Sequence, residues 1–141
     1  MESKSITFDI EENENGKLLI NLPITICGNE NQIILAALDT GYNGFIAAPP
    51  EIANKAKALH SREVKCFQAY GEEIIVKENL ILVYFEGKCI AGHLAIFSNL
   101  NGCLAGLEFL QQLGMDVTIS CKNKKITFSK TTKEAKKEKN K

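Results

Sequence analysis

The chain has 141 residues, 17 acidic and 17 basic side chains, and 45% apolar residues. That length fits one domain with its own core, and the composition excludes collagen-like, low-complexity and wholly disordered proteins. No apolar run reaches the roughly 18 residues that a membrane helix needs, and residues 1–4 lack the layout of a secretory signal. We therefore expect a cytoplasmic protein, or one that was trimmed, with no membrane partner.

Charge is distributed unevenly along the chain. Residues 1–30 carry six acids against two lysines, whereas residues 129–141 carry six lysines against two glutamates. The lysine-rich tail 130–141 could contact nucleic acid or another acidic surface. It has no interleaved aromatic residue on which a base could stack. We predict a disordered tail and no nucleic-acid partner.

The first half of the chain consists of short β-type runs separated by turns. Ile6–Ile10 and Lys17–Cys27 are predicted strands that pair through the turn Glu11–Gly16, which ends in a hairpin-forming Asn-Gly. Pro23 should place the second strand at a sheet edge or bend it. The run Gln32–Leu38 is nearly all apolar, so we expect it to be buried on both faces.

Two short helices are predicted. Glu51–Leu59 consists of good helix formers after two prolines, and His60 follows it where a cation suits the helix dipole. Leu107–Leu113 precedes Gly114, the residue type that most often ends a helix. The remaining predicted strands are Glu63–Ala69, Ile74–Val76, Leu80–Phe85, Lys88–Phe97, Asp116–Ser120 and Lys125–Ser129, the last two forming a hairpin. The sum is a mostly β domain.

The five cysteines and ten glycines form no recognisable ligand pattern. There is no Cys-x-x-Cys pair, no closely spaced pair of histidines and no phosphate-binding glycine motif. An odd number of cysteines favours reduced thiols, most of them small apolar residues of the core. We therefore expect neither a metal nor a cofactor.

The candidate for chemistry is the Asp-Thr-Gly that follows the apolar run. Asp39 ends the predicted strand, Thr40 adds a hydroxyl donor, and Gly41 permits a sharp turn whose N–H can approach the carboxylate. A buried carboxylate without compensating hydrogen bonds or charges costs several kcal/mol. By itself the tripeptide is also compatible with an ordinary Asx turn at the end of a strand.

Three segments in order resemble the retropepsin-like aspartic proteases, in particular their small, single-domain clan AA members in prokaryotes. The active-site segment of that family is similar to residues 37–47, which prolines and a short helix follow. The segment that leads into its C-terminal helix is similar to residues 104–110, and its flap hairpin is similar to residues 67–72. The chain departs from the family at Tyr42, where viral retropepsins and pepsins have Ala or Ser, and at Ala105, which replaces a larger aliphatic residue.

The resemblance implies a closed acid-protease β-barrel with two short helices, formed by residues 17–129 after an N-terminal strand and turn segment, 1–16. It also implies an aspartic endopeptidase that acts on an extended protein or peptide substrate. Because the chain contains a single Asp-Thr-Gly, the active unit would be a homodimer. The residues implied are Asp39, Thr40 and Gly41 for catalysis, and Asn43, Ala69, Tyr70 and Gly71 for substrate contact.

The chemistry of such a site follows from the repulsion of two carboxylates. Two of them in contact retain one proton, which supplies a general acid and a general base side by side. The base would deprotonate a shared water, which attacks the peptide carbonyl. The alternative is a catalytically silent dimerisation or peptide-binding module of the same fold, in which Asp39 would be dispensable.

Overall fold

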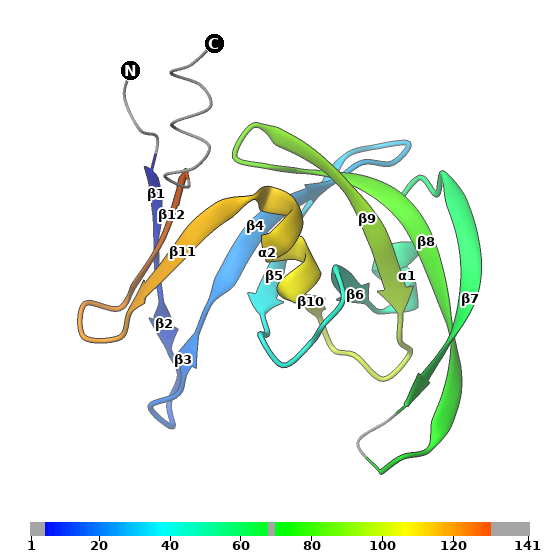
Figure 1. The fold of residues 1–141 in the computed structure, drawn as a ribbon, viewed down its shortest axis with the longest axis horizontal. Coiled ribbons are helices and arrows are strands. Elements are labelled where there is room, and N and C mark those ends of the chain that lie inside the picture. The colour runs from blue at the N-terminus through cyan, green and yellow to red at the C-terminus, as the bar shows by residue number, and fades with distance from the viewer. Residues whose placement is uncertain (1–4, 68–69, 131–141) are drawn as a thin grey trace.

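The computed structural model describes residues 5–67 and 70–130. It is built from strands with two short helices, so the expected mostly β class is confirmed (Figure 1). In chain order the elements are β1 (Ser5–Asp9), β2 (Glu11–Glu12), β3 (Leu18–Leu19), β4 (Asn21–Ile26), β5 (Gln32–Leu38), β6 (Ile46–Ala48), α1 (Pro50–Ala53), β7 (His60–Phe67), β8 (Glu73–Phe85), β9 (Lys88–Ile96), β10 (Cys103–Ala105), α2 (Leu107–Leu113), β11 (Met115–Ser120) and β12 (Lys125–Lys130).

The largest sheet has the strand order β4-β5-β10-β6-β9-β8-β7. Strand β10 runs parallel to β5 and antiparallel to β6, and β6 runs parallel to β9. Strand β4 also pairs with β8, so the first and last strands of the run β4-β5-β10-β6-β9-β8 are hydrogen-bonded to each other. The short strand β10 was not predicted, and the runs predicted at 74–76 and 80–85 form the single strand β8.

Within the largely aliphatic core, a row of aromatic rings links the sheets to α2. Phe45, Phe85, Phe109 and Phe128 are fully buried. Phe45 contacts Phe109 with 5.7 Å between ring centroids, Phe109 contacts Phe85 at 5.6 Å, and Phe85 contacts Phe128 at 5.3 Å. Burying a side chain of this size contributes about 1.5–3 kcal/mol, so this row holds α2 and the C-terminal strand against the main sheet.

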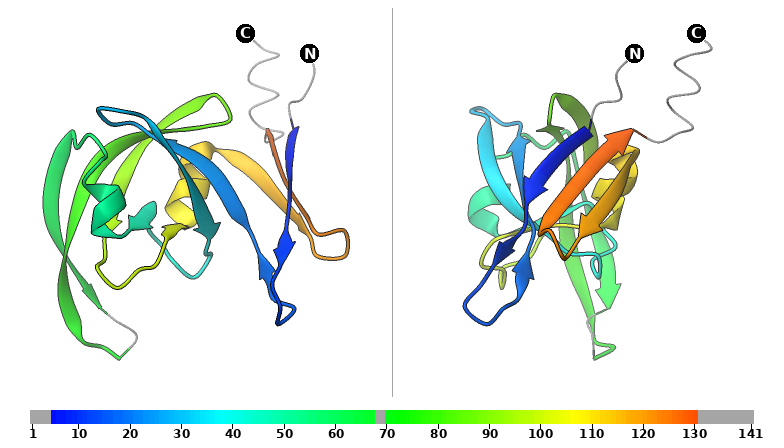
Figure 2. Two further views of the ribbon diagram at one scale, coloured as in Figure 1. Left: turned by 180° about the vertical axis from the view of Figure 1, so that it is seen from behind. Right: turned by 90° about the vertical axis from the view of Figure 1, so that its left-hand side faces the viewer.

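A second sheet has the order β1-β12-β11 and corrects one predicted pairing (Figure 2). Strand β1 pairs along its whole length with β12 and not with the run 17–27. Its Phe8 ring contacts the rings of Phe85 and Phe128, at 5.7 and 5.9 Å between centroids. This distant packing outweighs the local turn signal, which produces only the short ladder between β2 and β3.

Strand β5 is buried on one face only, which corrects the second expectation. Ile34 and Ala36 point into the core, whereas Ile33 is 75% and Leu35 is 64% exposed. The side chains of a strand alternate between the two faces of the sheet, and only one face of β5 meets the core. Pro23 lies opposite Leu35, in the part of β4 that pairs with β5 alone. This position has a free strand edge, which is one of the two places predicted for the proline.

One predicted helix is much shorter than expected, and the other is confirmed. Helix α1 ends at Ala53 because the following chain bonds to strands: the N–H of Lys57 donates to the carbonyl of Cys27, and the N–H of Leu59 donates to the carbonyl of Leu80. His60 therefore begins β7 and does not end a helix. Helix α2 ends as predicted at Gly114, whose φ of 64° is left-handed.

Candidate active site

Asp39 lies at the end of β5, beside β10. Its backbone N–H donates to the carbonyl of Ala105 at 2.9 Å, which continues the β5–β10 pairing by one residue. The N–H of Gly41 donates to Asp39 Oδ1 at 2.9 Å, and the N–H of Tyr42 donates to the Asp39 carbonyl at 3.1 Å. The side chain of Asp39 is thus held within its own turn, and in a single chain it is exposed.

The loop that carries Asp39 is anchored by the start of α2. The N–H groups of Leu107 and Glu108 donate to the carbonyls of Tyr42 and Gly44, at 2.9 and 3.1 Å. Such N–H groups in the first turn of a helix have no partner within the helix. The loop supplies those partners, so residues 42–44 and 107–108 are fixed relative to each other.

Two glycines make this close approach possible. A Cβ at Gly106 would lie 2.3 Å from the carbonyl oxygen of Gly44 and 2.5 Å from that of Tyr42. A Cβ at Gly44 would lie 2.3 Å from the hydroxyl of Tyr42, whose ring folds over this glycine. The sequence interpretation did not assign either contact. The available signal was the presence of Gly44 within residues 37–47 and of Gly106 within residues 104–110, the two segments that resemble the family.

Tyr42 is partly buried. Burial, followed by the charges of Glu78, Cys66 and Glu108, raises the pKa of Tyr42 to about 12. Cys66 lies on β7 and Glu78 on β8. Burial is the largest cause of this shift, and the pKa of the Tyr42 hydroxyl therefore reports mainly its partly buried position.

The predicted site residues fall into two groups. Thr40 and Asn43 are exposed on the same loop as Asp39. Tyr70 and Gly71 lie at the tip of the β7–β8 hairpin, where Tyr70 is 92% exposed and Gly71 has a φ of 77°. Ala69 lies outside the described residues. The hairpin tip and the loop after β5 lie at the same end of the molecule in Figures 1 and 2.

A single chain supplies one aspartate to this site. Asp9 forms an ion pair with Lys125, and Asp116 lies opposite Ser129 on β11. Among residues 5–67 and 70–130, no three His, Cys, Asp or Glu side chains lie close enough to hold a metal ion. In the same ranges, no helix is both long and apolar enough to span a membrane.

All five cysteines are free thiols, but most are not the buried residues that we expected. Only Cys103 is buried, and burial raises its pKa to about 11. Cys89, near the start of β9, and Cys121, in the turn after β11, are exposed. Cys66 is partly buried on β7, near Tyr42.

A polar surface pocket of about 530 Å³ lies apart from Asp39, around the start of β5 and the chain that follows α1. Its lining consists of amide and charged side chains with one alanine, from residues 29–32 and 54–57. The pocket lies at the start of β5, and the Asp39 loop follows the end of this strand. A strand rises roughly 3.3 Å per residue, so the length of β5 separates the two. The pocket is therefore not part of the candidate active site.

The fold is similar to those of solved aspartic proteases. No family model and no curated protein sequence matches the chain. Among solved structures, a retropepsin-like aspartic protease from Rickettsia conorii is similar, with a TM-score of 0.56 and 18% identity over 92% of this chain and 94% of that one. The simian foamy virus (mac) protease gives a TM-score of 0.47 and 13% identity, over 66% of this chain and 93% of the viral one. The chain therefore has a retropepsin-like fold.

Proposed function

We propose that the chain is an aspartic endopeptidase, active as a homodimer in which each copy supplies one Asp39. The observation that carries this proposal is the position of Asp39 in a retropepsin-like fold. Its carboxylate is exposed, accepts the N–H of Gly41, and belongs to a loop bonded to β10 and α2. An exposed carboxylate on an anchored loop is suited to meeting a second carboxylate at a fixed place.

Each residue of the proposed site has a distinct task. The two Asp39 carboxylates would retain one proton between them because both cannot be ionised in contact. The ionised one accepts a proton from a shared water, which attacks the peptide carbonyl while the other protonates the carbonyl oxygen. After the exchange of roles, the proton reaches the leaving nitrogen. Gly41 holds the carboxylate, and Thr40 braces its counterpart across the two-fold axis.

The substrate would lie extended between the Asp39 loop and the β7–β8 hairpin. A substrate strand there can bond through its backbone, which is the usual manner of extended-peptide binding. Asn43 would contact it from the loop, and Ala69, Tyr70 and Gly71 would contact it from the hairpin tip.

Asp39→Asn is the direct test of this proposal. The initial rate of cleavage of a mixed peptide library is measured against protein concentration, between mildly acidic and neutral pH. For the parent, we expect a rate that rises faster than linearly at low concentration because dimers form. In Asp39→Asn we expect the cleavage rate to fall at least about 1000-fold, since one general acid–base group alone accelerates a reaction about 100- to 10000-fold.

The same variant separates the peptidase from the catalytically silent module. If Asp39→Asn cleaves as fast as the parent, the assigned mechanism is wrong. If the parent binds peptides but cleaves none at any concentration, the binding module is the correct function. Asp116→Asn serves as the matched control because Asp116 is an exposed aspartate on β11, and it should leave cleavage unchanged.

A further inference from the structure

The seven-stranded sheet ends at β7, and one edge of this strand is open. Among residues 5–67 and 70–130, β7 pairs with β8 alone, along its full length of eight residues. It lies at the outer boundary of the molecule (Figures 1 and 2). It contains no proline and no bulge, two of the features that usually prevent an edge strand from pairing with another chain. The backbone of this edge can therefore pair with a further strand.

The charges on β7 limit which strand can pair with it. Glu63 and Lys65 are exposed, and Val64 between them is half-buried on the other face. In the part of the chain that the structure describes, Glu63 forms no ion pair, although Lys77 lies opposite it on β8. Lys65 contacts Glu73 at 3.4 Å, but its side chain remains 73% exposed. Both charges are therefore accessible to a partner strand.

These charges are complementary to those of a second β7 in one register. A two-fold axis between antiparallel strands passes through a residue, because directly opposite side chains must point to the same face of the sheet. An axis at Arg62, Glu63 or Lys65 would set two like charges against each other, which is destabilising. An axis at Val64 instead sets Glu63 of each copy against Lys65 of the other. The charges of β7 therefore favour a second copy of β7, centred on Val64.

Apolar side chains lie on the same face of this edge as the two charges. Phe67 is 74% exposed, and Ile75, which lies opposite Lys65 on β8, is 67% exposed. In the register centred on Val64, Phe67 would lie opposite Ser61 of the second copy. Exposed apolar side chains grouped beside an open strand edge are typical of a protein contact surface.

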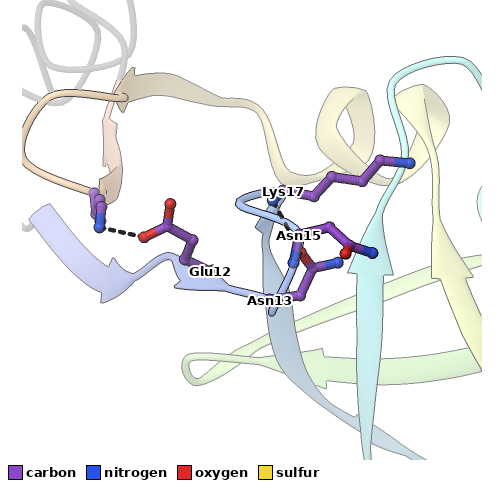
Figure 3. A network of polar contacts seen from close by, with 5 residues as sticks. Glu12, Asn13, Asn15 and Lys17 are labelled. Carbon is purple, nitrogen blue, oxygen red and sulfur yellow. Dashed lines mark hydrogen bonds and ion pairs between the residues drawn. The ribbon is translucent and has the colours of Figure 1, made fainter.

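The second sheet is less suited to such a contact. Its edge strands β1 and β11 have five and six residues, fewer than β7. After β1 the chain enters the β2–β3 hairpin, where the side-chain oxygen of Asn13 accepts the N–H groups of Asn15 and Lys17, each at 2.9 Å (Figure 3). Glu12 beside them already forms an ion pair of 2.6 Å with Lys124. The polar groups near this edge are thus used within the chain.

We propose that a second copy of the chain docks on the free edge of β7, antiparallel and centred on Val64, so that the two large sheets become continuous. This contact uses neither Asp39 nor the loop that carries it, so it goes beyond the proposed peptidase activity. A chain with two different two-fold contacts assembles beyond a dimer. The β7 contact would therefore join peptidase dimers into larger assemblies.

Two charge reversals, Glu63→Lys and Lys65→Glu, test the register. Each variant alone should associate poorly through β7, because the axis at Val64 then sets like charges against each other twice. A 1:1 mixture of the two should associate again, because position 63 of each copy then faces an opposite charge at position 65 of the other. Sedimentation equilibrium of the full chain over a concentration series gives the Kd of this association for the parent, each variant and the mixture.

A mixture of Glu63→Lys with Lys77→Glu is the matched control. It contains the same reversed charges, but Lys77 lies on β8, one strand away from the edge. This mixture should therefore not regain association. Thermal unfolding checks that each variant is folded, as expected for exposed side chains whose substitution usually changes stability by less than about 0.5 kcal/mol.

We expect the Kd to rise at least about tenfold in each charge-reversal variant and to return to within about threefold of the parent in their mixture. A parent that stays monomeric at all concentrations would overturn the inference. So would variants that keep the parent Kd, or a mixture that associates no better than its components. Peptide cleavage by the same samples is measured in parallel. Its absence would contradict the peptidase proposal and leave the β7 contact intact.

Discussion

The Asp39 loop and the tip of the β7–β8 hairpin are both exposed turns, but they are held in different ways. The loop is bonded to β10 and α2 through its own backbone, with Gly106 and Gly44 making room for the contact. At the hairpin tip, a Cβ on Gly71 would have nothing within 4 Å, and Tyr70 is almost fully exposed. The nearest support is the hairpin's own ladder with the Lys65–Glu73 ion pair, at 3.4 Å.

This difference matches the tasks that the proposed mechanism gives to the two regions. An acid–base group must be held in place because a misplacement of about 1 Å can cost roughly 100-fold in rate. A segment that closes over substrate must instead be able to move. Substitutions should therefore cost much more stability in the loop and its anchor than at the hairpin tip.

The largest effect is expected for Gly106→Ala. The new Cβ would meet the backbone carbonyls of Tyr42 and Gly44. Backbone atoms cannot avoid this contact by rotating about a side-chain bond. We expect a loss of about 2–3 kcal/mol in the free energy of unfolding, measured by urea denaturation, together with loss of any cleavage activity. Gly102→Ala is the control because its Cβ would meet nothing within 4 Å. Equal stability of the two variants would contradict the close approach.

Gly44→Ala should lower the free energy of unfolding less than Gly106→Ala, because the new Cβ would meet the side chain of Tyr42 and not the backbone. We expect a loss of about 1–2 kcal/mol in the parent. Most of this loss should vanish when Tyr42→Ala is also present, because that change removes the ring from the space. A double-mutant cycle of urea denaturation measures the coupling. Additive losses would show that the ring does not occupy this space in solution.

Gly71→Ala at the hairpin tip should lower the free energy of unfolding by about 1 kcal/mol. Its Cβ would have open space, so only the left-handed backbone, with a φ of 77°, opposes the change. Gly71→Asn should restore part of the loss because asparagine adopts this conformation more readily. Thermal unfolding of both variants is the measurement. A loss as large as that of Gly106→Ala would mean that the tip is packed.

At neutral pH the smallest effect on stability is expected for Tyr42→Phe, because the contribution of this hydroxyl should change only at alkaline pH. The pKa of Tyr42 is about 12 in the folded chain, above its ordinary value of 10. Unfolding therefore favours ionisation, and the stability linked to this hydroxyl is present below pH 10 and is lost between pH 10 and 12. The unfolding free energy of Tyr42→Phe should fall less steeply than that of the parent in this range. Tyr70→Phe, at an exposed position, should follow the parent.

Local patterns predicted much of this protein. Most of the strand-forming runs, the α2 helix with Gly114 at its end, and the β11–β12 hairpin all follow from contacts between near neighbours in sequence. The Asp-Thr-Gly and its turn, with the Gly41 N–H on the carboxylate, were also predicted from the residue types alone. These features need only a few consecutive residues, so the sequence is sufficient to determine them.

What the tertiary structure decided depends on residues that are far apart in the chain. Strand β1 pairs with β12 through aromatic packing against Phe85 and Phe128, and the chain after α1 leaves the helix to bond with β4 and β8. The exposure of Ile33 depends on which face of β5 the core covers. The anchoring of the Asp39 loop by α2 joins segments about 65 residues apart, and no local propensity encodes such a contact.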